Sequence, residues 1–118
     1  MDGRNAISRH GPEGIIVNGV EHTSSVVVAW RGEVRPWQVD SFDALTPAHF
    51  AEIAALKPEL MLFGSGPRIR FPAPALLRSL IDAGIGIETM DTAAACRTYN
   101  VLLAEDRSVV AALLFGSR

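Results

Sequence analysis

The sequence predicts one α/β domain, in which helices flank a mixed β-sheet and the N-terminal part is rich in strands. Three observations predict this class. Runs of β-branched residues broken by turn dipeptides fill the first part of the chain, whereas helical periodicity alternates with short apolar runs in the rest. The length of 118 residues and a hydrophobic content of 48% suit a single core.

The chain divides into a short N-terminal segment and one domain. Residues 1–13 are polar and interrupted by glycine and proline, which predicts a loose arm, or alternatively an edge element. A single domain over residues 14–118 follows. It opens with a strand at residues 15–17, and the Asn18-Gly19 pair after this strand is a turn signal typical of hairpins.

Two more strands follow in the N-terminal half. Residues 26–30 are β-branched or aromatic at most positions, which predicts a largely buried strand. Residues 34–39 predict a further strand at a sheet edge, because Pro36 lacks the N–H that a central strand needs. We expect Trp30 to lie in the core and Trp37 to be partly exposed, where it is available to a partner.

Helical signals begin at Thr46 and Pro47. Threonine at the N-cap position can accept a backbone hydrogen bond, and proline suits the first helical position. Pro58 ends this helix, because the residue before a proline is pushed out of the α region. The apolar residues 60–63 then predict a strand that is covered on both faces.

A strand–helix–strand crossover occupies residues 60–90. Pro72 and Pro74 introduce its helix, Gly84 suits the left-handed cap at its end, and residues 85–90 predict the second strand. Such a connection predicts parallel pairing of the two strands. The apolar stripe of the helix consists of Leu76, Leu77, Leu80 and Ile81.

The last helix begins at Asp91-Thr92, a capping pair, and runs to about Ala104. The last strand is expected at residues 108–115. Residues spaced three and four apart on one helix side predict the face that packs on the sheet. This face consists of Ala95, Tyr99 and Leu102.

Composition excludes several classes of protein. A formal net charge of −2 lacks the excess of Lys and Arg with which proteins bind nucleic acids or anionic membranes. The longest apolar run, residues 109–115, is far too short to cross a bilayer, and the first residues lack the apolar stretch of a signal peptide. One cysteine allows no internal disulfide, and three scattered histidines show no zinc spacing. We therefore expect a cytoplasmic protein without metal or cofactor.

Candidate binding residues follow two predicted strands. Because parallel strands end at the same edge of a sheet, the loop of Gly64, Ser65 and Gly66 should open beside Asp91 and Thr92. Glycines let main-chain N–H groups approach a small anion, and a helix N-terminus favours the same charge. The candidate ligand-binding set is therefore Gly64, Ser65, Gly66, Arg68, Asp91 and Thr92.

The same residues also make sense without any ligand. A Gly-x-Gly sequence after a strand is a common tight turn, and this loop lacks both a Walker lysine and a third glycine at dinucleotide spacing. Asp91 is a routine N-cap residue, and its charge opposes an anion. A self-contained network of turn and cap is therefore the alternative to a ligand pocket.

Cys96 is the one side chain that invites a catalytic interpretation. It lies among alanines, and the nearest histidine in the sequence is His49. A lone cysteine in such surroundings is typical of a small buried core residue rather than of a nucleophile. We assign no catalytic residue.

Residues 90–100, Met-Asp-Thr-Ala-Ala-Ala-Cys-Arg-Thr-Tyr-Asn, and the loop at Gly64, Ser65 and Gly66 carry a family resemblance. The chain resembles the MTH-like small α/β domain family, which includes mitochondrial complex I assembly factor 3 and the adipogenesis-associated domain protein. The resemblance extends over residues 14–115, and Ser65 retains the hydroxyl of the threonine that is frequent in the family. It implies a three-layer fold with a mixed five-stranded sheet and one antiparallel strand, and it implies no agreed reaction.

Two functions follow. The resemblance to an assembly factor, and the lack of a credible nucleophile–base or metal set in the sequence, favour a non-catalytic module that binds a protein partner. The alternative is a small-molecule-binding protein or enzyme that uses the edge formed by Gly64, Gly66, Asp91 and Thr92. The sequence identifies neither the partner, nor a substrate, nor the oligomeric state.

Overall fold

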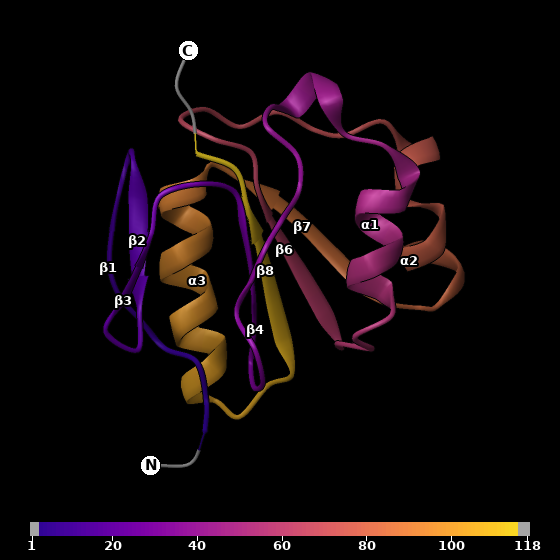
Figure 1. The fold of residues 1–118 in the computed structure, drawn as a ribbon. Coiled ribbons are helices and arrows are strands. Elements are labelled where there is room, and N and C mark those ends of the chain that lie inside the picture. The colour runs from indigo at the N-terminus through magenta and orange to yellow at the C-terminus, as the bar shows by residue number, and fades with distance from the viewer. Residues whose placement is uncertain (1–2, 116–118) are drawn as a thin grey trace.

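The computed structural model describes residues 3–115, which form two β-sheets and three layers (Figure 1). The smaller sheet is antiparallel, with the strands in chain order. These strands are β1 (Ile7–Gly11), β2 (Gly14–Val17) and β3 (Val20–His22). The larger sheet contains β5 (Arg35–Pro36), β4 (Val26–Ala29), β8 (Val109–Leu113), β6 (Leu60–Gly64) and β7 (Gly86–Met90), in that spatial order.

The larger sheet is mixed, as expected. β6 pairs in parallel with β7 on one side and β8 on the other, whereas β4 is antiparallel to both β8 and β5. β4 is therefore the one strand that runs against the other four. The expected mixed five-stranded sheet, with one antiparallel strand, is confirmed.

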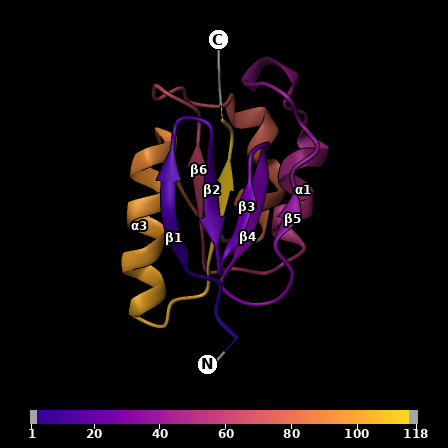
Figure 2. The ribbon, with the colours of Figure 1, turned by 60° about the vertical axis from the view of Figure 1, so that its left-hand side comes forward.

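Helices cover both faces of the larger sheet (Figures 1 and 2). On one face lie α1 (Pro47–Ala54) and α2 (Arg78–Asp82). On the other face lie α3 (Thr92–Ala104) and the smaller sheet, which packs beside α3. Two short 3-10 turns, Phe42–Ala44 and Pro74–Leu77, precede α1 and α2.

The strands at the centre of the sheet are buried on both faces. In β6, Met61 and Phe63 join the core under α1 and α2, whereas Leu62 joins the core under α3. The continuous apolar run in the sequence reflects this two-sided burial. On α3, Ala95 and Tyr99 are fully buried against the sheet, as predicted, but Leu102 is only partly buried and Leu103 is the leucine that joins the core.

The N-terminal segment is an ordered edge element rather than a loose arm. β1 begins at Ile7, a core residue, and pairs antiparallel with β2. Before it, Asn5 N donates to Trp30 O at 3.0 Å and Asn5 Nδ2 donates to Ala29 O at 2.9 Å. The expected boundary between a loose arm at 1–13 and a domain at 14–118 is therefore wrong from residue 5 onward. Residues 1–2 and 116–118 lie outside the described residues.

The expected burial of the two tryptophans is reversed. Trp37 is buried, and its ring packs edge-on against Phe50 and Phe63 at centroid distances of 5.6 and 6.0 Å. Its Nε1 donates to His49 O at 3.2 Å, so the polar end of the ring is also satisfied. Trp30 is only half-buried. The reason is that α1 closes over the end of β5, an arrangement that strand periodicity does not reveal.

The crossover between β6 and β7 differs in one respect from expectation. The stretch after Pro74 forms a 3-10 turn before α2, which shifts the helical register. Leu80 is fully buried, but Ile81 is half exposed and does not belong to the apolar stripe. Gly84 has a φ of 72°, which confirms the left-handed cap.

Candidate functional site

The two predicted strand ends lie side by side. β6 ends at Gly64 and β7 at Met90, and the parallel register pairs these two residues. Ser65 N donates to Met90 O at 2.9 Å, and Thr92 N donates to Gly66 O at 2.9 Å. The loops after both strands are thus bonded to each other at the carboxyl edge of the sheet, where ligands of open α/β sheets bind.

Thr92 connects three elements at this edge. Its hydroxyl accepts a hydrogen bond from Gly66 N at 2.9 Å and donates one to Leu114 O, just after β8, at 2.6 Å. Leu114 N in turn donates to Gly64 O at 2.9 Å. The buried Thr92 side chain therefore ties the start of α3 to the ends of β6 and β8.

Two glycines permit this arrangement, each for a different reason. A Cβ on Gly64 would come within 2.8 Å of Leu113 Cδ2 and 3.0 Å of Thr92 Oγ1, so only glycine lets α3 begin this close to β6. Gly66 has a φ of 108° and open space around its Cα, so its requirement is conformational.

Ser65 shapes the loop that follows β6. Its buried hydroxyl donates to Arg68 O at 2.8 Å and accepts from Arg70 N at 2.9 Å. The N–H groups of Ser65 and Gly66 also donate within the protein and are not available to an anion. The structure therefore has the self-contained network of turn and cap that the sequence left open.

Asp91 caps α3, as the sequence predicts. Its Oδ1 accepts from Ala94 N at 2.9 Å, and its charge lies at the positive end of the helix. The half-buried carboxylate is thereby used for helix stability.

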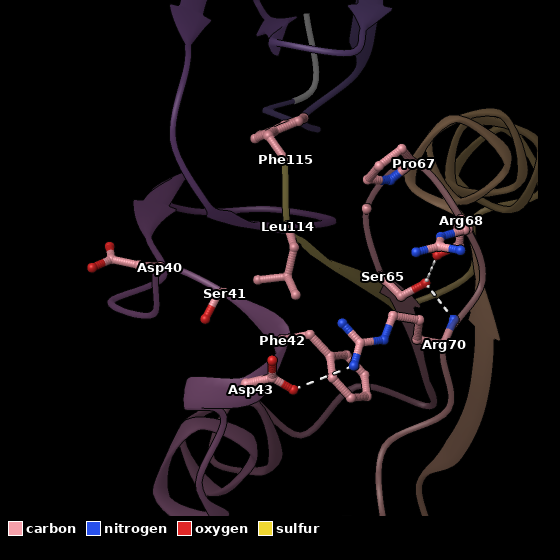
Figure 3. A pocket seen from close by; sticks show the side chains of 11 residues that line it. Asp40, Ser41, Phe42, Asp43, Ser65, Pro67, Arg68, Arg70, Leu114 and Phe115 are labelled. Carbon is pink, nitrogen blue, oxygen red and sulfur yellow. Dashed lines mark hydrogen bonds and ion pairs between the residues drawn. The ribbon is translucent and has the colours of Figure 1, made fainter. Parts of the chain in front are cut away.

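A first hollow lies beside the network, between residues 40–43 and the loop 65–70 (Figure 3). It measures about 200 Å³ and includes Ser65, Gly66 and Arg68 of the predicted set in its lining. The Arg70 guanidinium lies 4.1 Å from the centre of the Phe42 ring and pairs with Asp43 at 3.3 Å. Arg70 is thus held against the wall of this hollow.

A second hollow, of about 410 Å³, lies on the other side of the loop and has a more apolar wall. It includes Gly66, Asp91 and Thr92 of the predicted set. The remaining lining comes from the turn between β1 and β2, the start of α3 and the end of β8. These residues are His10, Gly11, Pro12, Pro67, Ala93, Leu114 and Phe115. Gly64 lines neither hollow and serves the packing of α3.

Sequence reasoning missed the most exposed apolar group at this edge. In the loop 67–71, Ile69 is 49% exposed and Phe71 is 71% exposed, whereas Pro72 is buried. A signal was present in the sequence, since Ile69 and Phe71 alternate with Arg68 and Arg70 in a short segment bounded by Pro67 and Pro72, where the structure forms no strand that could bury them. Exposed large apolar side chains close together mark contact surfaces more often than scattered ones do.

Cys96 lies in the core, as expected. It is fully buried, and this burial raises the pKa of its thiol from 9.0 to about 12, against the opposing charge of Arg97. Across residues 3–115, no three His, Cys, Asp or Glu side chains come close enough together to hold a metal ion. In the same range, no helix has the length and apolar character needed to cross a membrane.

Comparison with known proteins gives a consistent match over the whole fold. A family model described as "Protein of unknown function (DUF498/DUF598)" matches residues 7–114. A crystal structure of a Bordetella parapertussis protein is 38% identical, covers 97% of this chain and 98% of its own, and superposes with a TM-score of 0.91. A solution structure from Bordetella pertussis, described as a Mth938-like domain, is 32% identical, with coverages of 98% and 88% and a TM-score of 0.85.

A curated relative supplies a functional name. The protein "NADH dehydrogenase (ubiquinone) 1 alpha subcomplex assembly factor 3" from Bos taurus is 32% identical over 110 residues, which cover 92% of this chain and 59% of the relative. The chain spans about three fifths of the length of the curated relatives it matches first.

Proposed function

This chain belongs to the DUF498/DUF598 family of Mth938-like domains, which includes assembly factor 3 of complex I, and from that premise we propose that it is a non-catalytic, assembly-factor-like module that binds another protein. One observation carries the proposal. The loop 67–71 displays two large apolar side chains, Ile69 and Phe71, beside arginines at the carboxyl edge of the sheet.

The loop is organised before any partner binds. Ser65 Oγ bonds to the main chain at Arg68 and Arg70, and the Arg70 side chain is held by Phe42 and Asp43 (Figure 3). A surface that is already ordered loses less conformational entropy on binding than a mobile one does. The loop therefore presents its apolar groups at low entropic cost.

The composition of the loop suits a protein interface. Aromatic and arginine side chains are enriched at the centres of interfaces, and burying exposed apolar area is the main favourable term in association. Arg68 is exposed on the same loop. The matching partner surface has an apolar cleft with acidic residues at its rim.

The alternative, a small-molecule site built on Gly64, Gly66, Asp91 and Thr92, is less well supported. The N–H groups of Ser65 and Gly66 and the hydroxyl of Thr92 already bond within the protein. A ligand would have to displace these bonds or to bind without them.

The proposal includes a cytoplasmic location. The single cysteine of the chain is a buried thiol with no partner for an internal disulfide, so the protein gains no stability from an oxidising compartment.

The experiment is a comparison of affinity-purified complexes from native expression. We expect specific proteins to co-purify with the wild type and to be lost with an Ile69→Ser, Phe71→Ser double variant. Val101→Ser is the matched control, because Val101 is 57% exposed on α3, away from the loop. Equal recovery with the double variant, or no specific partner with the wild type, would contradict the proposal.

A further inference from the structure

The outer strand β7 of the larger sheet is open on one side. It is hydrogen-bonded to β6 and has no other strand neighbour within residues 3–115. The opposite outer strand, β5, is only two residues long and contains Pro36, which has no N–H to offer. β7 has five residues and no proline, so its main chain can accept a further strand, and the charged Glu88 is its one protecting side chain.

The hydrogen bonds of β7 identify the free groups. Gly86 N donates to Glu59 O at 3.1 Å, and Met90 O accepts from Ser65 N at 2.9 Å, so both residues bond toward β6. The N–H and C=O of one residue point to the same edge of a strand, and successive residues alternate between edges. Ile87 and Thr89 therefore direct their N–H and C=O groups outward. These four groups match the bonding pattern of one added strand.

Glu88 decides what kind of strand can be added. It lies between Ile87 and Thr89 and is exposed. In a symmetric antiparallel pair of two copies that uses both outward-facing residues, Glu88 would lie directly opposite Glu88 of the second copy. Like charges directly opposite each other destabilise a strand pair, whereas opposite charges stabilise it. The edge thus disfavours that self-pairing and favours a strand with a basic residue at that position.

We propose that the open edge of β7 accepts one extended segment of a partner protein, with Lys or Arg opposite Glu88. Main-chain bonds to Ile87 and Thr89 supply the binding, and Glu88 supplies the selectivity, as in other cases of strand addition. Beside this edge, the half-exposed Ile81 lies on α2, which packs against β7. The inference does not rest on the loop 67–71, and either contact can exist without the other.

Two synthetic peptides test the proposal. Both alternate threonine and valine, and they differ only in a central residue, lysine in one and glutamate in the other. Each is titrated into the ¹⁵N-labelled protein while amide exchange is followed by NMR. We expect the lysine peptide to slow exchange at Ile87 and Thr89, and to bind about tenfold more tightly than the glutamate peptide, a difference of about 1.4 kcal/mol.

Variants separate the edge of β7 from other edges. Glu88→Lys should reverse the preference between the peptides, because the like charge then belongs to the lysine peptide. Glu21→Lys is the matched control on β3, an outer strand of the smaller sheet, and should leave the preference unchanged. The amide spectrum of each variant verifies its fold.

Three results would overturn the proposal. The first is no slowing of exchange at Ile87 and Thr89 at millimolar concentrations of either peptide. The second is an unchanged preference in Glu88→Lys. The third is a concentration-dependent dimer of the wild type with both amides protected in the absence of peptide, which would make the occupant a second copy. The loop variants at Ile69 and Phe71 should bind the peptides normally, so this test is separate from that of the proposed function.

Discussion

Thr92 and Gly66 are hydrogen-bonded in both directions. Thr92 N donates to Gly66 O at 2.9 Å, and Gly66 N donates to the hydroxyl of Thr92, also at 2.9 Å. The first residue of α3 is thereby locked to the loop after β6. At the edge where a ligand was expected, these polar groups connect the start of α3 to the loop after β6.

Replacing Thr92 should lower the stability of the fold. Thr92→Val leaves Gly66 N and Leu114 O without partners in a buried place, and we expect a loss of about 2 to 3 kcal/mol in the free energy of unfolding. Thr92→Ser keeps the oxygen and should lose clearly less. Urea denaturation of both variants gives the comparison, and equal losses would show that the hydroxyl is not the cause.

Gly64 should not tolerate a side chain. In Gly64→Ala the new Cβ would meet Leu113 and Thr92 at 2.8 and 3.0 Å, and the resulting shift should cost about 1 to 3 kcal/mol. Gly11→Ala is the control, since no atom lies within 4 Å of the added carbon there. Equal Tm values for Gly64→Ala and Gly11→Ala in thermal melting would argue against tight packing at Gly64.

Tyr99 should stabilise the fold through both its ring and its hydroxyl. The hydroxyl donates to Asn5 O at 2.6 Å and lies 3.1 Å from Ala29 O. We expect Tyr99→Phe to cost about 1 to 3 kcal/mol and Tyr99→Ala about 3 to 5 kcal/mol, measured by urea denaturation. Val101→Ala, on the exposed side of the same helix, should stay within about 0.5 kcal/mol of the wild type. A Tyr99→Ala variant as stable as the wild type would contradict the role of Tyr99 in packing α3 against the sheet.

Cys96 should be unreactive in the native protein. Burial raises its thiol pKa to about 12, so the reactive thiolate is scarce at neutral pH and remains scarce at pH 9, the ordinary pKa of the group. Iodoacetamide should label the thiol in denaturant but not in buffer, as mass spectrometry would show. Rapid stoichiometric labelling under native conditions would contradict the buried position.

Glu59 should make stability depend on pH. Its bonds to Arg107 Nε at 2.6 Å and to Ser108 N at 3.2 Å lower the pKa of its carboxyl below 4.5. A lowered pKa means that the stabilisation is present above pH 4.5 and is lost as the pH falls toward the folded-state value. Glu59→Gln should therefore lower the Tm slightly at pH 7, and this loss of Tm should become smaller as the pH falls below 4.5. A difference in Tm between Glu59→Gln and the wild type that grows toward acid pH would contradict a lowered pKa for Glu59.

Local chemistry accounts for the elements that the sequence predicts well. Asn18 and Gly19 both adopt positive φ, at 50° and 85°, as a tight hairpin turn requires. The helix does not continue to Pro58, since α1 ends at Ala54 and Lys57 has a left-handed φ of 56°. Asp91 caps α3 by accepting a hydrogen bond from Ala94 N, three residues further along the chain. In each case the determining interaction spans only a few residues, so the sequence pattern contains it.

For the candidate site too, the sequence determined one part and left another part open. The sequence alone determined that the loops after residues 64 and 90 meet, because parallel strands connected by a helix must end at one edge. It also determined the family and the three-layer fold. The sequence could not show whether the polar groups at this edge bond to one another or remain free for a ligand.

Only the tertiary structure decided which side chains reach the surface. It buried Trp37 under α1, left Ile81 outside the core, ordered the strand that starts at Ile7, and exposed Ile69 and Phe71 on a loop held by Ser65. It also left the outer edge of β7 open at Ile87 and Thr89. Burial and hydrogen-bond partners depend on elements that are distant in the chain, and local periodicity reports only which side of an element is apolar, not what covers it.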